Sequence, residues 1–252
     1  FTAPNSMTTY NWNITSGDAV IDGAANAQSV TIDFGTTTSV IQLTITDANG
    51  CSSVCTQTVT TAAFDWGDLP DISASTAAND YQTSLANNGP RHNIISGLHL
   101  GSTVDAESDG QSSNLADGDG ADEDGFTFPN TLNISPSSNF QRPLNITNST
   151  SLTAHLEGWI DWNGDGDFED LNEMIVDLSD DGTGDFGMTN ITINVPSNVV
   201  QNQSIGVRFR LSHTDNMTPY GQINSGEVED YLISVECPSN QCLPVQFVII
   251  RK

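Results

Sequence analysis

The stretch SIGVRFRLS, residues 204–212, alternates apolar and polar side chains and decides the fold class. Successive side chains of an extended strand project to opposite faces. Val207, Phe209 and Leu211 therefore share one face, and the two arginines between them share the other. Other stretches of the chain repeat this period of two, and the first sixty residues show no helical period. We therefore predict an all-β protein.

Working outward from this strand, the sequence divides into two β-rich regions. The first region has short strands rich in Val, Ile and Thr, separated by Gly, Asn and Asp turns, a pattern that favours an Ig-like β-sandwich. In SVIQLTITD, residues 39–47, we expect Ile41, Leu43 and Ile45 to face its core. The second region favours a larger, jelly-roll-like β-sandwich with long acidic loops. Its strands are expected at 126–134, 141–148, 152–162, 174–178, 188–195, 204–212 and 227–235.

The boundary between the regions is predicted at residues 61–64, where FDWGDLPD begins an acidic, aromatic segment. We therefore predict an N-terminally incomplete Ig-like sandwich over 1–62 and a second sandwich over 63–236. Residues 237–252 are expected to form a linker followed by one apolar strand.

The charge of the chain restricts its partners. Six Lys and Arg stand against 32 Asp and Glu, which gives a formal net charge of −26. This balance argues against nucleic acid or an anionic membrane as a partner and favours cations. The carboxylates must be solvated, protonated or bound to metal, because too few basic residues are present to pair with them. No apolar run approaches the roughly 20 residues of a membrane span.

The strongest metal motif is DWNGDGDFEDLNE, residues 161–173. Its first six positions match the D-x-[DN]-x-[DN]-G spacing of a calcium loop, in which Gly166 permits the sharp turn. The flanks alternate like strands, so we expect an EF-hand-like loop between two strands. An EF-hand loop has its closing, bidentate glutamate at position 12. Here position 12 is Asn172, and the glutamate, Glu173, comes one residue later. A solvated acidic turn is the alternative. The expected calcium ligands are Asp161, Asn163, Asp165, Asp167 and Glu173.

A second acidic run, ADGDGADEDG at residues 116–125, is also a candidate for metal binding. A solvated loop is the alternative, because charged, glycine-rich segments order poorly alone. A carboxylate from this run, Asp119 or Asp122, is the rival of Glu173 as the ligand that closes the calcium loop. The candidates here are Asp117, Asp119, Asp122 and Asp124, and the preceding VDAESDG could add Asp105, Glu107 or Asp109.

The strand EVEDYLISV, residues 227–235, carries carboxylates toward the core. Strand period places Glu227 and Glu229 on the face of the apolar residues, and a carboxylate that enters a core needs a partner. We expect Arg208 and Arg210 to supply it, with a metal as the rival.

The cysteines fall as two close couples, Cys51 with Cys55 and Cys237 with Cys242, and local pairing into disulfides is the simplest connectivity. Cys51 and Cys55 could bridge only if the chain folds back between them, since a straight strand would hold them roughly 13 Å apart. Four buried thiols are the alternative. Zinc is less favoured, because no histidine lies near either couple.

Enzymatic motifs are absent from the sequence. No HExxH, Gly-x-Ser-x-Gly or CxxC motif occurs. Carboxylates are so abundant that proximity cannot identify a catalytic pair of the glycosidase type. We therefore predict no catalytic residues. A binding module would instead need an exposed aromatic platform for polysaccharide, for which Trp66 or Trp159 are the candidates.

Several motifs in order resemble the GEVED domain, which takes its name from the sequence at residues 226–230. The resemblance includes FDWGDLPD, YQTSLANNGPRH, LHLGSTVDAESDGQ, GDGADEDG, GWIDWNGDGDFED, VRFRLS and SGEVEDYLISV, and covers most of residues 64–236. It implies an accessory β-module of a large secreted or surface protein, of the kind found in Bacteroidota, with no enzymatic activity. The first sixty residues resemble a PKD-like or Ig-like surface repeat. CLPVQFVIIRK resembles the opening of a sorting domain for type IX secretion.

The expected function is thus a non-enzymatic, calcium-stabilised module of a secreted or cell-surface adhesin-like protein. The abundance of Thr, Ser, Asn and Gly and the near absence of Lys are also typical of extracellular β-proteins. Expected partners are Ca²⁺, a surface glycan or protein, and the type IX machinery through the C-terminal strand. The alternative is a carbohydrate-binding accessory region of a secreted polysaccharide-degrading enzyme.

Overall fold

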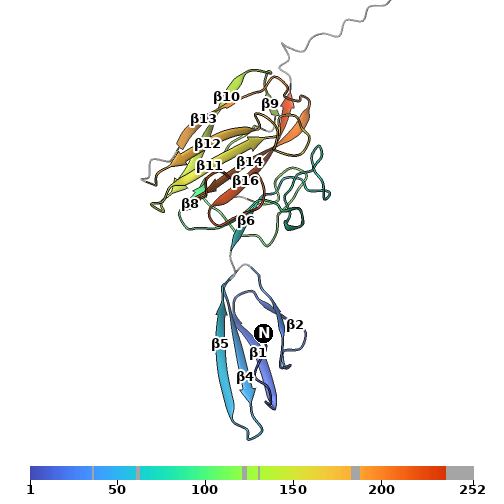
Figure 1. Ribbon diagram of the computed structural model, residues 1–252, viewed down its shortest axis with the longest axis vertical. Helices are drawn as coiled ribbons and strands as arrows, with labels where there is room; N and C mark the ends of the chain where they lie inside the picture. Colours follow the sequence, from blue (N-terminus) through green and yellow to red (C-terminus); the bar gives the residue numbers. More distant parts are fainter. Residues whose placement is uncertain (36, 61–62, 121–123, 130, 183–187, 237–252) are drawn as a thin grey trace, which may run out of the picture. The chain divides into compact units, whose positions relative to one another are not determined.

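The structure is a computed structural model (Figure 1), and it describes residues 1–35, 37–60, 63–120, 124–129, 131–182 and 188–236. Strands make up its regular structure, and a single 3₁₀ turn at Leu85–Asn87 is the one helical element among these residues. The prediction of an all-β fold is therefore confirmed. No helix in the described part of the chain has the length and apolar character to span a membrane.

Contacts divide the chain into two units, Phe1–Phe64 with Ala106–Ser108, and Asp65–Asp105 with Asp109–Lys252. In the first unit, an antiparallel sheet has the order β1-β4-β5, and a two-stranded sheet pairs β2 with β3. Their bounds are β1 Thr9–Ser16, β2 Val20–Asp22, β3 Thr31–Asp33, β4 Ser39–Thr46 and β5 Ser52–Val59.

The core of the first unit confirms the predicted face of β4. Ile41 is buried with Trp12, and Leu43 and Ile45 pack against this cluster. These three β4 residues share one face because they are two positions apart. The sequence pattern therefore identified the inward side of this strand.

The predicted disulfide between Cys51 and Cys55 is wrong. Both residues are free and exposed, so neither the disulfide nor the alternative of a buried thiol describes them. Cys51 directly precedes β5, and Cys55 lies inside it, paired with Leu43 of β4. The extended strand separates their side chains, so the fold-back that a bridge requires does not occur. The second couple, Cys237 and Cys242, lies outside the described residues.

The second unit contains a five-stranded sheet of order β12-β11-β14-β16-β9 and a three-stranded sheet of order β13-β10-β8 (Figure 1). All neighbours are antiparallel except β16 and β9, which run parallel. The bounds are β8 Leu98–Leu100, β9 Thr131–Asn133, β10 Asn139–Asn148, β11 Ala154–Ile160, β12 Met174–Asp180, β13 Met188–Asn194, β14 Gln203–Ser212 and β16 Glu227–Glu236. A smaller sheet has the order β15-β7-β6, formed by β6 Phe64–Trp66, β7 Arg91–Asn93 and β15 Gln222–Ile223.

The larger core joins the inner faces of the five-stranded and three-stranded sheets. Val207, Phe209 and Leu211 of β14 contribute to it from one sheet, and Leu144 and Ile193 contribute from the other. All five are essentially inaccessible to solvent, which makes this contact the main apolar stabilisation of the unit. The arrangement is a β-sandwich.

The opposite face of the five-stranded sheet is also covered. Every residue of β14 from Ile205 to Ser212 is buried, including Arg208 and Arg210. A second apolar cluster, formed by Leu69, Tyr81, Trp159, Phe168 and Met217, lies on this side. Long connecting segments therefore cover what would otherwise be a solvated face, and we call this side the loop face of the sheet.

Candidate metal centre

The 161–173 loop connects β11 to β12, as expected for an EF-hand-like loop between two strands. Its first carboxylate, Asp161, is fully buried, and backbone N–H groups of the loop converge on it. The N–H of Gly164 donates to Oδ1 at 2.6 Å, and that of Gly166 donates to Oδ2 at 2.9 Å. The chain is therefore wrapped around the Asp161 carboxylate.

Asp161 also fixes the loop to β14. The hydroxyl of Tyr81 donates to Asp161 Oδ2 at 2.9 Å and accepts the N–H of Gly206 at 2.7 Å. The Tyr81 ring stacks on Phe168 with 5.5 Å between the ring centroids. The loop is thus held by the carboxylate of Asp161 and by the aromatic ring of Phe168.

Gly166 is required by two independent constraints. Its φ of +94° lies in the left-handed region that residues with a side chain rarely adopt. A Cβ at this position would also lie 1.8 Å from the carbonyl oxygen of Ala77. The glycine predicted for the sharp turn therefore also allows the loop to approach a neighbouring segment.

The late glutamate is explained by a turn at the end of the loop. Asn172 has φ +74°, and the N–H of Glu173 donates to the carbonyl of Asp170 at 3.2 Å. This tight turn takes up the additional residue and leaves Glu173 with 1% of its surface exposed. Its carboxylate accepts the N–H groups of Trp162 at 3.1 Å and Asp170 at 3.0 Å. The structure therefore places Glu173 inside the loop.

The electrostatics of the loop favour a cation or a proton. Burial, together with the charges of Asp161, Asp170 and Asp165, raises the pKa of Glu173 to about 7. Burial also raises the pKa of Asp161, with a contribution from Asp165. Neither Asp161 nor Glu173 has a basic partner among the described residues. A set of oxygen donors with excess negative charge suits calcium.

The remaining predicted ligands of this loop lie at its outer side. Asp165 is exposed, and Asn163 and Asp167 are half-buried. The Asn163 amide donates to Asp165 Oδ2 at 2.9 Å and also to Asp170 at 2.5 Å. Burial raises the pKa of Asp167, and the neighbouring charge of Asp165 adds to the effect. The Asn163 amide therefore draws Asp165 and Asp170 together at the outer side of the loop.

Asp117 and Asp124, two described carboxylates of the 116–125 segment, bind elsewhere than the 161–173 loop. Asp117 Oδ1 accepts the hydroxyl of Ser113 at 2.7 Å. Asp124 accepts both the N–H and the hydroxyl of Ser102. Asp122 lies outside the described residues. Asp117 and Asp124 are thus bound by serines of neighbouring segments, and Glu173 occupies the interior of the 161–173 loop.

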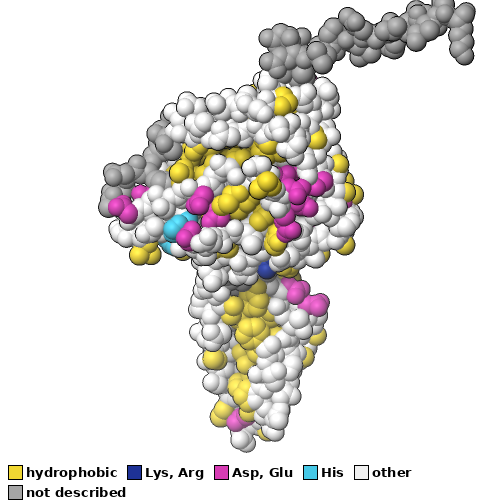
Figure 2. All heavy atoms as spheres, turned by 45° about the horizontal axis from the view of Figure 1, so that its top comes forward, with side chains coloured by type: hydrophobic (Ala, Val, Ile, Leu, Met, Phe, Trp, Pro, Cys, Tyr) yellow, Lys and Arg dark blue, Asp and Glu magenta, His cyan; other side chains and the backbone are white. Residues whose placement is uncertain are grey.

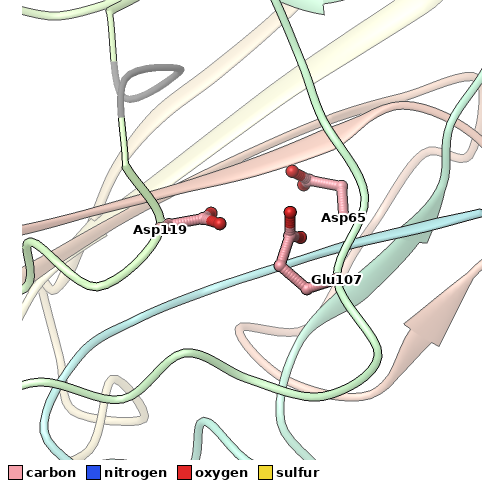
Figure 3. A group of neighbouring side chains, drawn as sticks. All are labelled: Asp65, Glu107 and Asp119. Carbon is pink, nitrogen blue, oxygen red and sulfur yellow. The ribbon is translucent and has the colours of Figure 1, made fainter. Parts of the chain in front are cut away.

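Asp119 belongs to a different acidic group. Its side chain and that of Asp65 turn toward each other (Figure 3), and each offers a carboxylate oxygen within 4.8 Å of the other. A second group with the same spacing is formed by Glu157, Asp177 and Asp215. Groups of this kind could hold a metal ion. The 161–173 loop does not itself place three carboxylates this close together among the described residues. Of the other predicted candidates, Asp109 accepts the N–H of Leu85 at 2.6 Å.

Glu227 and Glu229 of β16 each hold a different segment of the chain through its backbone N–H groups. Glu227 accepts the N–H of Leu100. Glu229 accepts the N–H groups of Asp124 at 3.0 Å and Gly125 at 2.7 Å. Its pKa is raised to about 8 by burial. These two carboxylates lie on the core face, as predicted, but backbone N–H groups satisfy them instead of the predicted arginines.

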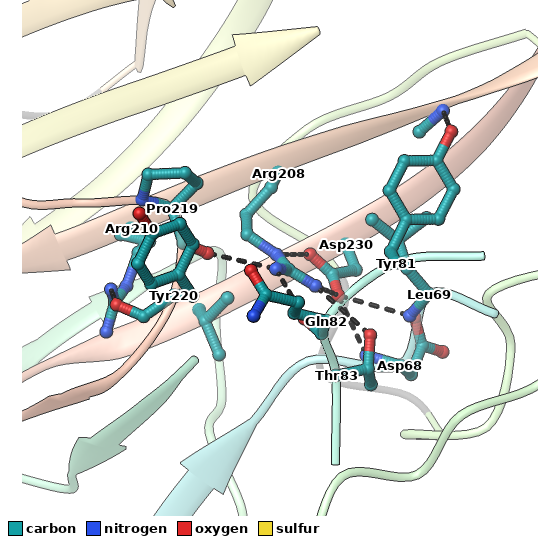
Figure 4. A network of polar contacts seen from close by, with 12 residues as sticks. Asp68, Leu69, Tyr81, Gln82, Thr83, Arg208, Arg210, Pro219, Tyr220 and Asp230 are labelled. Carbon is teal, nitrogen blue, oxygen red and sulfur yellow. Dashed lines mark hydrogen bonds and ion pairs between the residues drawn. The ribbon is translucent and has the colours of Figure 1, made fainter. Parts of the chain in front are cut away.

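Arg208 pairs with Asp230, which corrects the predicted pairing. Two bonds of 2.7 Å join the guanidinium to the carboxylate, because Arg208 and Asp230 lie opposite each other on the loop face of β14 and β16 (Figure 4). Asp230 also accepts the N–H of Asp68 at 2.9 Å, and Arg208 donates to the carbonyls of Gln82 and Pro219. This buried ion pair is therefore the anchor of three loop segments.

Arg210 has a neutral partner. Its Nε–H donates to Nε2 of His92 at 2.8 Å, and its terminal nitrogens donate to the carbonyls of Thr218, Tyr220 and Gly221. Burial lowers the pKa of Arg210 to about 9. Sequence reasoning missed His92, because no local spacing connects it to a strand more than a hundred residues away.

The candidate sugar platform is absent from the surface. Trp66 is 2% exposed and Trp159 is 4% exposed. The guanidinium of Arg91 lies over the Trp66 ring at 5.1 Å from its centroid, and Trp159 belongs to the apolar cluster of the loop face. These two rings therefore act as core residues and cannot stack on a polysaccharide.

Comparison with known proteins agrees with the motif on β16. No curated protein and no solved structure matches the chain. The family model described as GEVED domain matches residues 155–234, which run from β11 into β16 and include the 161–173 loop. The predicted resemblance to the GEVED domain is confirmed over residues 155–234.

Proposed function

We propose that this chain is a non-enzymatic, calcium-stabilised module of a secreted or cell-surface, adhesin-like protein. The observation that carries the proposal is the 161–173 loop, which buries Asp161 and Glu173 without a basic partner and gathers further acidic side chains at its outer side. Calcium would neutralise this charge. Asp161, Asn163, Asp165, Asp167 and Glu173 would hold the ion.

The role of the ion is structural in this proposal. The loop is tied through Tyr81 to β14, the central strand of the larger sheet. An ion that binds the folded loop and not the unfolded chain would raise the free energy of unfolding by about 2.7 kcal/mol at a hundred times its dissociation constant. Extracellular calcium would therefore favour the folded module after export.

The acidic surface supports the proposed setting. Asp and Glu side chains far outnumber Lys and Arg on the face shown in Figure 2, in keeping with the net charge of −26. The carboxylates on the core face of β16 are occupied by backbone N–H groups, which suits a structural role for them. We propose no catalytic residue. The carbohydrate-binding alternative loses its named platform, since Trp66 and Trp159 are buried.

The test is thermal unfolding and protease resistance of the whole chain with calcium and with a chelator. We expect calcium to raise the melting temperature, and Asp165→Asn together with Asp167→Asn to remove most of this gain. Glu236→Gln, which changes an exposed acid on β16, is the matched control and should keep the gain. An unchanged melting temperature and unchanged proteolysis on chelation would contradict the proposal.

The secretion route is a separate part of the proposal and rests on the resemblance of CLPVQFVIIRK to a sorting domain. Deletion of residues 243–252 in the native host should stop secretion without changing the calcium-dependent melting of the purified chain. If the truncated chain were still secreted at the normal level, the proposed role of this segment would be wrong.

A further inference from the structure

A second acidic group lies on the loop face of the five-stranded sheet, outside the 161–173 loop. Antiparallel pairing places Glu157 of β11 directly opposite Asp177 of β12. Like charges in directly opposite positions destabilise a sheet unless something neutralises them. The pair therefore raises the question of what compensates its charge.

The carboxylate of Glu157 is buried and only half satisfied. The residue is 1% exposed, and its Oε1 accepts the N–H of Met217 at 3.0 Å. Its Oε2 is buried without a hydrogen-bond partner among the described residues. A buried, unpartnered carboxylate oxygen is costly, because it has lost its water without gaining another donor.

A third carboxylate completes the group. Asp215 follows β14, in the connection that leads to Met217. Asp215, Glu157 and Asp177 each offer a carboxylate oxygen within 4.8 Å of the others. Calcium binds oxygen ligands at about 2.3–2.6 Å, so two ligands of one ion can be up to roughly 5 Å apart. The spacing of the three oxygens fits one shared cation.

Two basic side chains adjoin the group, and neither takes the free oxygen. Arg210 lies opposite Glu157 in the ladder, but its hydrogen bonds go to His92 and to three backbone carbonyls. His155 places Nδ1 3.4 Å from Asp215 Oδ1. The buried Glu157 Oε2 therefore still requires a ligand.

We propose that Glu157, Asp177 and Asp215 form a binding site for a divalent cation of the oxygen-preferring class, separate from the 161–173 loop. Asp177 and Asp215 are exposed, so an ion can reach the group from solvent, while Glu157 supplies the buried ligand. The ion would tie β12, an edge strand of the sheet, and the Asp215 connection to β11.

Calcium titration calorimetry of the whole chain tests the site. Asp177→Asn combined with Asp215→Asn changes only exposed side chains and should reduce the number of bound calcium ions by one relative to Glu236→Gln. Asp165→Asn with Asp167→Asn, which addresses the 161–173 loop, should leave the second site occupied. The two pairs of substitutions therefore separate failure of this proposal from failure of the proposed loop site.

Unfolding provides a second readout. In the presence of a chelator, Glu157→Gln should unfold at the same temperature as the unmodified chain or at a higher one, because it removes like-charge repulsion. Calcium should raise the unfolding temperature of Glu157→Gln by less than it raises that of the unmodified chain. If the Asp177 and Asp215 double variant binds as many ions as Glu236→Gln, under calcium and in a separate magnesium titration, the proposal is overturned.

Discussion

Arg210 donates its Nε–H to Nε2 of His92 at 2.8 Å, so the imidazole is an acceptor at that nitrogen. Its Nδ1–H donates to the carbonyl of Ser225 at 2.6 Å. Both ring nitrogens are therefore engaged in the neutral tautomer, and protonation of Nε2 would break the bond to Arg210. Burial lowers the pKa of His92 well below its usual value, and the charge of Arg210 lowers it further.

This arrangement predicts acid sensitivity. A histidine whose pKa is depressed in the folded state contributes stability above its unfolded pKa of about 6.5, and this stability is lost as pH falls below that value. We expect the free energy of unfolding to decline below about pH 6.5 with a smaller slope in His92→Gln. Denaturant unfolding of both proteins between pH 5 and 8 measures this. Equal slopes would show that His92 does not control the decline.

The Arg208 to Asp230 pair predicts a large loss of stability when one partner is removed. Asp230→Asn would leave a buried guanidinium without its counter-ion, which typically costs about 3–5 kcal/mol. Arg208→Lys should also be costly, because Lys cannot reproduce the two parallel bonds. Chemical denaturation checks both, with Glu236→Gln as control. A loss below about 1 kcal/mol in both variants would contradict the anchoring role.

The two glycines Gly166 and Gly120 form a matched pair, since both have φ +94°. A Cβ on Gly166 would lie 1.8 Å from the Ala77 carbonyl oxygen, whereas one on Gly120 would meet no atom of the described residues within 4 Å. Gly120→Ala should therefore cost only the backbone strain, about 1–2 kcal/mol. Gly166→Ala should cost clearly more in the same unfolding assay. Equal losses would mean that the contact of the loop with Ala77 does not matter.

We infer that the left-handed conformation of Asn172 places Glu173 in the interior of the loop. Because Asn172 has φ +74°, Asn172→Ala should strain the turn, misplace Glu173 and weaken calcium binding. Asn172→Gly should preserve binding, since glycine accepts this conformation. Calorimetric titration of both variants separates these cases. If alanine and glycine behaved alike, the left-handed turn would have no part in placing the ligand.

The cysteines of the first unit should react readily. Cys51 and Cys55 are exposed and free, so both should be alkylated under native conditions without a reductant. Peptide mass spectrometry after labelling measures each position separately. Recovery of a peptide that links Cys51 to Cys55 would contradict the extended course of β5.

The sequence predicts the features that depend only on the alternation of side chains along one strand or on the spacing of residues within one loop. The prediction that Ile41, Leu43 and Ile45 face the core follows from the alternation of a strand, and the prediction of Gly166 follows from the sharp turn that a calcium loop needs. Such features need no knowledge of the rest of the chain. They account for the strands and for the position of the 161–173 loop.

What the sequence does not predict depends on contacts between distant segments. Alternation placed Glu227 and Glu229 on the core face, but it could not reveal the N–H groups of Leu100 and Gly125 that satisfy them. Asp230 was missed as the partner of Arg208, because the choice depends on the register between two strands. The local sequence LEGWIDW, residues 156–162, does not mark Glu157 as a candidate metal ligand, because its neighbours Asp177 and Asp215 come from other segments.

The long-range hydrogen bonds of β16 also determine when the second unit can fold. Asp230 binds the backbone of Asp68 across 162 residues, and Glu227 binds that of Leu100 across 127. Contacts of such high sequence separation form slowly, since a long loop must close before they stabilise anything. A chain that emerges from its N-terminal end cannot make them until residues 227–230 are available. The second unit should therefore acquire its native structure only after nearly all of its chain has been synthesised. Until then, during synthesis, it remains incompletely folded.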